Sequence, residues 1–151
     1  MGLCRGVPAS YAALSEELDL GLLHKQLWDS QGVVLLPRVI GPGQLAWHPI
    51  SGHHQLQPGS FGISEPDPRL TTGIALPPAT VVFVPGLAFT ADGRRLGQGG
   101  GFYDRLLAER PDLCAIGVGF GVQLLDDLPC EAHDACLAGL VIAGRLVLTP
   151  S

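Results

Sequence analysis

The glycine-rich segment at residues 94–104 has the residue types best suited to chemistry. It reads Arg-Arg-Leu-Gly-Gln-Gly-Gly-Gly-Phe-Tyr-Asp. Glycines let a backbone approach a ligand closely and turn its N–H groups inward, and a helix that starts directly after them adds the positive end of its dipole. Two adjacent arginines add fixed, fork-shaped donors. The segment therefore predicts a site that binds phosphate groups.

Neither of the two common phosphate-binding templates fits this segment. A Walker A loop needs Lys and then Ser or Thr after its last glycine, but Phe102 and Tyr103 follow Gly101, and a dinucleotide fingerprint needs glycine at position 102. Glycines also cluster at tight turns, so a structural turn stays an open alternative. Asp104 favours a ligand site, because a carboxylate beside bound phosphate can bind Mg²⁺, although the helix dipole alone also stabilises an acid there.

The elements around the segment predict where it lies. Residues 80–84 are uncharged and rich in Val and Phe, which predicts a buried strand, and residues 102–109 have helical spacing. Ligands of open α/β sheets bind at the carboxyl ends of such strands. The other expected elements are a helix at 15–29, strands at 33–36 and 114–120, a hairpin of 44–50 with Leu56, and a hairpin at 137–148 that turns at Ala143-Gly144. Two long loops are expected as well, a proline-rich one at 59–78 and a second one from Pro85-Gly86 to Gly101.

The length and composition predict one folded domain over residues 1–151, and the order of strand, loop, helix and strand predicts the α/β class with a mostly parallel sheet. The chain is 46% hydrophobic and 15% charged, which excludes a disordered protein. Nine Lys and Arg against 14 Asp and Glu give a net charge of -5, so we expect no nucleic-acid partner. No apolar run is long enough for a membrane span, and the first residues do not resemble a secretory signal. We expect a cytoplasmic protein without a membrane partner, and the sequence leaves its oligomeric state open.

The glycine-rich segment and its flanks resemble the signature of the 5-formyltetrahydrofolate cyclo-ligases, also called methenyltetrahydrofolate synthetases. The resemblance rests on Val-Pro-Gly-Leu-Ala-Phe at 84–89 and on the segment at 93–105, in order and spacing. Flanking pieces at 35–38, 62–66 and 123–134 agree with the same family. The resemblance implies a three-layer α/β/α fold with a mostly parallel sheet. It also implies ATP- and Mg²⁺-dependent conversion of 5-formyltetrahydrofolate, a reduced folate, to 5,10-methenyltetrahydrofolate, with release of ADP and phosphate.

The resemblance also implies a role for particular residues. Mg²⁺ takes one or two protein carboxylates and completes its shell with phosphate oxygens and water, so two acids would suffice. Aromatic residues such as Phe61 and Tyr103 are candidates to stack on the pterin ring. The expected residues are Arg95 and Tyr103 for catalysis; Arg95, Leu96, Gly97, Gln98, Gly99, Gly100, Gly101, Phe102 and Tyr103 for ATP; Glu17 and Phe61 for the folate; and Asp104 and Asp134 for the metal.

Two features depart from the family pattern. The motif around Glu17 ends in Leu20, where the family commonly has Thr. Family members usually begin with a further helix that carries Lys and Arg and with a strand before the glutamate motif, so we expect this chain to be N-terminally shortened. A non-catalytic folate- or nucleotide-binding relative is therefore an alternative.

A second alternative is a zinc-binding interaction domain. Cys130, His133 and Cys136 have the spacing Cys-x2-His-x2-Cys, and Cys114 could add a fourth ligand. A structural zinc site usually has two close ligand pairs, however, and isolated cysteines commonly serve as small apolar residues.

Overall fold

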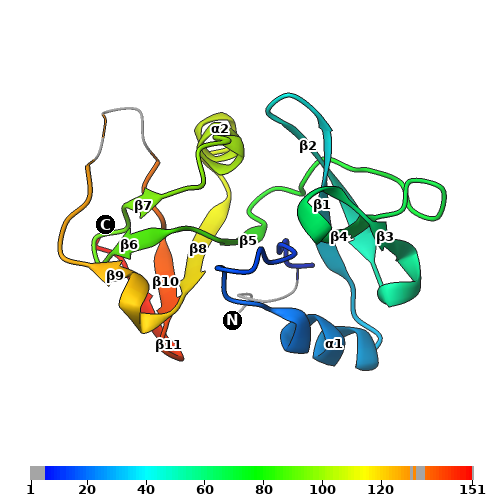
Figure 1. Ribbon diagram of the computed structural model, residues 1–151, viewed down its shortest axis with the longest axis horizontal. Coiled ribbons are helices and arrows are strands. Elements are labelled where there is room, and N and C mark those ends of the chain that lie inside the picture. The colour runs from blue at the N-terminus through cyan, green and yellow to red at the C-terminus, as the bar shows by residue number, and fades with distance from the viewer. Residues whose placement is uncertain (1–5, 130, 132–134, 151) are drawn as a thin grey trace.

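The computed structural model describes residues 6–129, 131 and 135–150, without the side chain of Phe61. Figure 1 shows strands β1–β4 in one half of the view and β6–β11 in the other, with β5 between them. None of the helices in the described ranges is long and apolar enough to cross a membrane. The elements are helices α1 (Gly21–Asp29) and α2 (Phe102–Glu109) and strands β1 (Val34–Gly41), β2 (Gln44–Ile50), β3 (Leu56–Pro58), β4 (Ser64–Pro66), β5 (Val81–Val84), β6 (Ala88–Thr90), β7 (Arg95–Leu96), β8 (Cys114–Gly119), β9 (Leu124–Leu125), β10 (Gly139–Ile142) and β11 (Arg145–Leu148).

An extended stretch at residues 8–10 joins the two halves. Ala9 donates its N–H to the carbonyl of Val81 and accepts the N–H of Phe83, both at 2.9 Å, and it forms parallel bridges to Leu35 and to β5. Strand β5 pairs in parallel with β8, and β8 with β10, whereas β1–β2 and β10–β11 are antiparallel pairs. The α/β class is confirmed and the sheets are mixed. A three-layer arrangement with a mostly parallel sheet stays a prediction.

The predictions for the elements beside the glycine-rich segment are confirmed. Helix α2 has the predicted bounds, β5 and β8 lie within the predicted strands, and β10 and β11 form the predicted hairpin. Ala143 and Gly144 have φ values of 51° and 75°, as a two-residue turn with both residues in the left-handed region requires.

The predicted strand at 33–36 is too short, because Pro37 does not end it. The N–H and carbonyl of Leu35 form hydrogen bonds with the stretch at 8–10. Strand residues two apart direct these groups to the same side, so the backbone nitrogen of Pro37 also points away from β2. That stretch does not extend beside Pro37, and a residue without an N–H is tolerated there. Strand β1 therefore continues to Gly41.

The predicted hairpin of 44–50 with Leu56 is wrong. Strand β2 instead pairs with β1 through the turn at Pro42-Gly43, where Gly43 has a φ of 68°. This pairing aligns Val34 with Ile50, both fully buried. Leu56 belongs to β3, which pairs with β4. Strand β4 lies inside residues 59–78, which were predicted as a loop. The predicted loop before Gly101 likewise contains β6 and β7.

The helix predicted at 15–29 begins only at Gly21. Glu17 lies in a turn where its carboxylate accepts the N–H of Leu14 at 2.9 Å, and Asp19 accepts the N–H of Gly21 at 2.9 Å. Short side chains that bond to nearby backbone groups compete in this way with helix formation. Glu17 consequently lies before the helix and not on its surface, and it is 8% exposed.

The two helices pack into different hydrophobic cores. Leu27 and Trp28 of α1 cover Val34, Leu36 and Ile50, and the Trp28 indole donates to the carbonyl of Ile50 at 2.8 Å. The larger core combines Leu107 of α2 with Leu35 and with residues of β5, β8 and β10. Since neighbouring residues of a strand point to opposite faces, the two cores lie on opposite sides of β1.

His24 should make the stability of the fold depend on pH. Its Nε2 atom lies 2.6 Å from Oγ of Ser10, the residue is 6% exposed, and burial lowers its pKa. The contribution of His24 to the free energy of unfolding is therefore complete above the pKa of about 6.5 of an unfolded histidine. It is lost as the pH falls toward the lower pKa of His24 in the folded protein. We expect the free energy of unfolding, measured with urea, to fall between about pH 8 and pH 5.

In the variant His24→Gln this fall should be smaller. His48→Gln should also reduce the fall, because His48 is buried and its pKa is lowered as well. His54→Gln, which changes an exposed histidine, is the matched control. A pH profile of His24→Gln identical to that of the unmodified protein would contradict the assignment to His24.

Candidate active site

Arg95 is a buried positive charge at the start of the glycine-rich segment. Its side chain is 8% exposed, and its Nε donates to the carbonyl of Pro85 at 2.6 Å. Nη1 lies 3.6 Å from Oδ1 of Asp104, and the guanidinium carbon lies 5.3 Å from the centroid of the Tyr103 ring. Burial lowers the pKa of Arg95, while Asp104, Tyr103 and Glu17 oppose that shift. Arginine stays protonated in proteins, so the charge is fixed at this position.

The hairpin of β6 and β7 directs Arg95 inward. Between the strands, Thr90 donates its hydroxyl to Asp92 and accepts the N–H of Arg94 at 3.0 Å, and Gly93 has a φ of 93°. Arg94 then bonds to Asp127 and to the carbonyl of Leu128. Because consecutive strand residues alternate in direction, Arg95 points to the opposite side, toward Pro85 and α2.

Glu17 and Tyr103 lie close enough to Arg95 to change each other's ionisation. Burial raises the pKa of Glu17, whereas the N–H of Leu14 and the charge of Arg95 lower it. Burial also raises the pKa of Tyr103 well above its usual value, with Arg95 opposing and Glu17 adding to the shift. The structure thus brings the predicted residues Glu17, Arg95 and Tyr103 together from three separate parts of the chain.

The start of α2 offers unused hydrogen-bond donors to a ligand. Gly101, with a φ of 70°, is the cap residue, and no side chain caps the helix. The first N–H groups of a helix have no partner within it, and the helix dipole favours an anion there. Asp104 lies in this first turn and is 48% exposed, so its carboxylate is accessible to a cation.

Glycine is favoured at two positions of the segment for different reasons. At Gly97, a Cβ atom would lie 3.0 Å from the guanidinium nitrogens of Arg95, so the guanidinium would have to shift by a few tenths of an ångström. At Gly101, the left-handed backbone disfavours any side chain, and a Cβ atom would lie 2.8 Å from Arg105. The loop therefore packs tightly against both arginines.

The other predicted residues of the segment do not join this cluster as closely. Leu96 is 47% exposed, and Gln98 contacts Glu16 at 3.5 Å. The ring of Phe102 lies under the guanidinium of Arg105, 5.7 Å from it, on a different side of α2. Asp134 lies outside the described residues, as does the side chain of Phe61.

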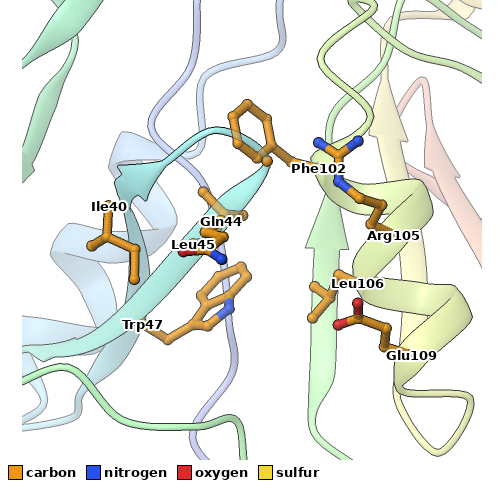
Figure 2. Close-up of a pocket in the computed structure, with 9 residues that line it drawn as sticks. Ile40, Gln44, Leu45, Trp47, Phe102, Arg105, Leu106 and Glu109 are labelled. Carbon is orange, nitrogen blue, oxygen red and sulfur yellow. The ribbon is translucent and has the colours of Figure 1, made fainter.

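A pocket of about 290 Å³ lies beside Phe102, between the β1–β2 hairpin and α2. Figure 2 shows Trp47 and Leu45 on the hairpin and Leu106 on the helix, facing each other across it. Arg105 and Glu109 supply its charged groups. Because it is lined by Phe102 and not by Tyr103 or Arg95, this pocket adjoins the cluster but does not contain it.

Tyr11 is a residue of the site that the sequence did not indicate. Its hydroxyl donates to the carbonyl of Leu18 at 2.6 Å and so holds the turn that carries Glu17. Burial raises the pKa of Tyr11 well above its usual value, and Glu17 and Tyr103 add to the shift. Its position shortly before Glu17 in the sequence is the one signal that could have identified it.

The described residues contain no group of three or more His, Cys, Asp or Glu side chains that could hold a metal ion. A single accessible carboxylate such as Asp104 still fits Mg²⁺, which binds largely through phosphate oxygens and water when a nucleotide is present. The predicted zinc ligands Cys130 and His133 lie outside the described residues, and Cys114 and Cys136 are free thiols. Zinc binding stays the alternative that it was in the sequence.

Comparisons with known proteins agree on one family. The family model for the 5-formyltetrahydrofolate cyclo-ligase family matches residues 8–143. The chain is 33% identical to the 5-formyltetrahydrofolate cyclo-ligase of Mycolicibacterium smegmatis, covering 91% of this chain and 69% of that protein. It is also 33% identical to the same-named protein of Escherichia coli K12, covering 91% of this chain and 78% of the relative.

A solved structure extends this agreement to the fold. The 5,10-methenyltetrahydrofolate synthetase of Aquifex aeolicus has a TM-score of 0.77 and 30% sequence identity, over 96% of this chain and 72% of that one. Together with the match over residues 8–143, this shows that the chain belongs to the 5-formyltetrahydrofolate cyclo-ligase family.

The burial of Tyr11 and the partial burial of Tyr103 can be tested directly. The chain contains two tyrosines, Tyr11 and Tyr103, and the pKa of each is raised far above the usual value of about 10. We expect the folded protein to show almost no tyrosinate absorbance at about pH 10.5, because burial disfavours the phenolate, and the urea-unfolded protein to show most of the absorbance of two tyrosinates. Unfolded Tyr11→Phe and Tyr103→Phe should each show about half of that absorbance. A folded-state titration centred near the usual pKa would contradict this arrangement.

Proposed function

We propose that this protein closes 5-formyltetrahydrofolate to 5,10-methenyltetrahydrofolate with ATP, releasing ADP and phosphate. The observation that carries the proposal is the convergence of Glu17, Arg95, Tyr103 and Asp104 on an uncapped helix start. Membership of the cyclo-ligase family over residues 8–143 supports the same reaction.

ATP binds with its phosphates at the glycine-rich segment in this proposal. The free N–H groups at the start of α2 and the fixed charge of Arg95 both attract an anion. Residues 95–103 supply the backbone that surrounds the phosphates. Because Nε of Arg95 is already held by Pro85, its terminal nitrogens have little freedom and present a constant geometry to the nucleotide.

Asp104 and Asp134 are the two proposed magnesium ligands. Of these two, Asp104 lies within the described residues. When bound, Mg²⁺ would neutralise the charge that develops on the transferred phosphoryl group. Asp104 is suited to this role since its carboxylate is both 48% exposed and held 3.6 Å from Arg95 at the expected position of the phosphates.

Glu17 is the proposed anchor of the folate, together with the ring of Phe61. An ionised carboxylate accepts hydrogen bonds, and the pterin ring presents N–H donors. Glu17 is buried and linked to the ATP side through Arg95, so the two substrates would meet between residue 17 and the glycine-rich segment.

The reaction depends more on how the protein positions the two substrates than on a strong base. The oxygen of the formyl group attacks the terminal phosphorus of ATP, and ADP leaves. The neighbouring folate nitrogen then attacks the activated carbon, and the carbon–oxygen bond breaks as phosphate departs. A fixed cation and backbone donors stabilise charge in the first step. A neutral Tyr103, held so by burial, donates a hydrogen bond without exchanging a proton.

The remaining details of the proposal come from the sequence and the family. We place the reaction in the cytoplasm, with a reduced folate and ATP as the small-molecule partners. The three-layer α/β/α arrangement is part of the same proposal.

Removing the charge at either end of the phosphate site should abolish most activity. We expect Asp104→Asn and Arg95→Met each to lower kcat/KM for ATP by about 100-fold or more, because both act on developing charge. The formation of 5,10-methenyltetrahydrofolate, followed by its absorbance with and without ATP, measures this. Asp29→Asn and Arg69→Met are matched controls on exposed side chains. Full activity in Asp104→Asn at limiting Mg²⁺ would contradict the metal assignment.

Glu17 should control the folate and not the nucleotide. Glu17→Gln is expected to raise KM for the folate about 10- to 100-fold, the effect of losing a hydrogen bond to a charged group, with KM for ATP nearly unchanged. Because burial raises the pKa of Glu17, the carboxylate gains a proton sooner as the pH falls, so KM for the folate should rise toward acid pH in the unmodified enzyme. This rise should be absent in Glu17→Gln. Equal effects of the substitution on both substrates would contradict the assignment.

A further inference from the structure

Gln123 connects the ends of two neighbouring parallel strands. Strand β5 ends at Val84 and β8 at Gly119, and the chain after β8 forms a single turn of 3₁₀ helix at Gly121–Gln123. From this turn the side-chain amide of Gln123 donates to the carbonyl of Gly86 at 2.8 Å and to that of Leu87 at 3.2 Å. It therefore links the loop after β8 to the loop after β5.

The oxygen of the same side-chain amide also forms a hydrogen bond. It accepts the N–H of Phe120 at 2.7 Å, which fixes the orientation of the side chain. The space that it occupies is kept open by Gly119, where a Cβ atom would lie 2.6 Å from the amide oxygen. Gln123 is thus held in one position with three hydrogen bonds.

The loop that Gln123 holds is the one that orients Arg95. The carbonyl of Pro85 accepts Nε of Arg95 at 2.6 Å, and Leu87 donates its N–H to the carbonyl of Leu96 at 2.8 Å. The residues at 85–87 therefore face Arg95 and Leu96 on one side and Gln123 on the other. A shift of this loop would carry the guanidinium of Arg95 with it.

We propose that Gln123 is a positioning residue for Arg95: its amide fixes the loop at 85–87, and that loop fixes the guanidinium that binds the nucleotide. This inference rests on the proposed function, since it assigns Arg95 to the phosphates of ATP. Displacement of a catalytic group by about 1 Å is enough to cost a large part of a reaction rate.

Two variants distinguish the hydrogen bonds that the Gln123 amide donates from the space that its side chain fills. Gln123→Met removes all three hydrogen bonds, whereas Gln123→Glu keeps the shape and the acceptor for Phe120 but cannot donate to the carbonyls of Gly86 and Leu87 when ionised. If donation positions Arg95, both variants should raise KM for ATP about tenfold, the scale of one or two lost hydrogen bonds. KM for the folate should change by less than about twofold, because Glu17 is held by its own turn.

The matched control is Gln55→Met. The amide oxygen of Gln55 also accepts a backbone N–H, that of Ser51 at 2.6 Å, beside a 3₁₀ turn at His53–Gln55 outside the cluster of Glu17, Arg95 and Tyr103. It should leave both KM values unchanged. Binding of ATP to each variant by calorimetry gives a second measurement that does not depend on turnover.

Three results would overturn the inference. The first is a Gln123→Glu enzyme with the KM for ATP of the unmodified protein, because the shape alone would then suffice. The second is an equal rise of both KM values, and the third is loss of the folded state in both variants, since Gln123 would then hold the fold as a whole. Absence of ATP-dependent turnover in the unmodified protein would instead reject the proposed function.

Discussion

The site depends on one buried positive charge, that of Arg95. A guanidinium that is 8% exposed is costly to remove from water unless its donors and its charge are matched. Here the carbonyl of Pro85, the carboxylate of Asp104 and the ring of Tyr103 supply the match. The close approach of the chain at Gly97 follows from the same need, because a side chain there would displace the guanidinium.

The mixed sheet brings the second half of the site to this charge. The stretch at 8–10 lies between β1 and β5, so the residues that follow it leave the sheet near the loops after β5. Tyr11 then bonds to the carbonyl of Leu18, and the resulting turn places Glu17 where the charge of Arg95 affects its pKa. A strand pairing that involves only a few residues therefore determines how close Glu17 comes to Arg95.

Sequence patterns predicted the elements that carry strong local signals. The apolar β-branched run of β5, the helical spacing of α2 and the turn at Ala143-Gly144 were each identified correctly. The pairing of β1 with β2 was missed because His48 and Pro49 weaken the strand pattern, and periodicity does not show that Ile50 aligns with Val34 and is buried with it. Helix α1 was predicted too long because the local bonds of Glu17 and Asp19 are invisible to periodicity.

The candidate site was predictable to a similar extent. The resemblance to the family identified Glu17, Arg95, Tyr103 and Asp104, which the structure brings together. It assigned no role to Tyr11 or Gln123, because each contributes a hydrogen bond to a backbone carbonyl, that of Leu18 for Tyr11 and that of Gly86 for Gln123, and a motif leaves such a partner unspecified.

The ionisation of the cluster agrees with phosphoryl transfer in preference to proton transfer. Burial keeps the phenols of Tyr11 and Tyr103 neutral, so both hydroxyls keep a proton that they can donate in a hydrogen bond at neutral pH. Arg95 stays charged in spite of its burial. A site with fixed donors and a fixed cation offers a developing phosphate charge the same surroundings before and during the reaction, which is the condition under which electrostatic stabilisation lowers a barrier. Glu17 differs from these three groups, because burial raises the pKa of a carboxylate that can gain a proton as the pH falls.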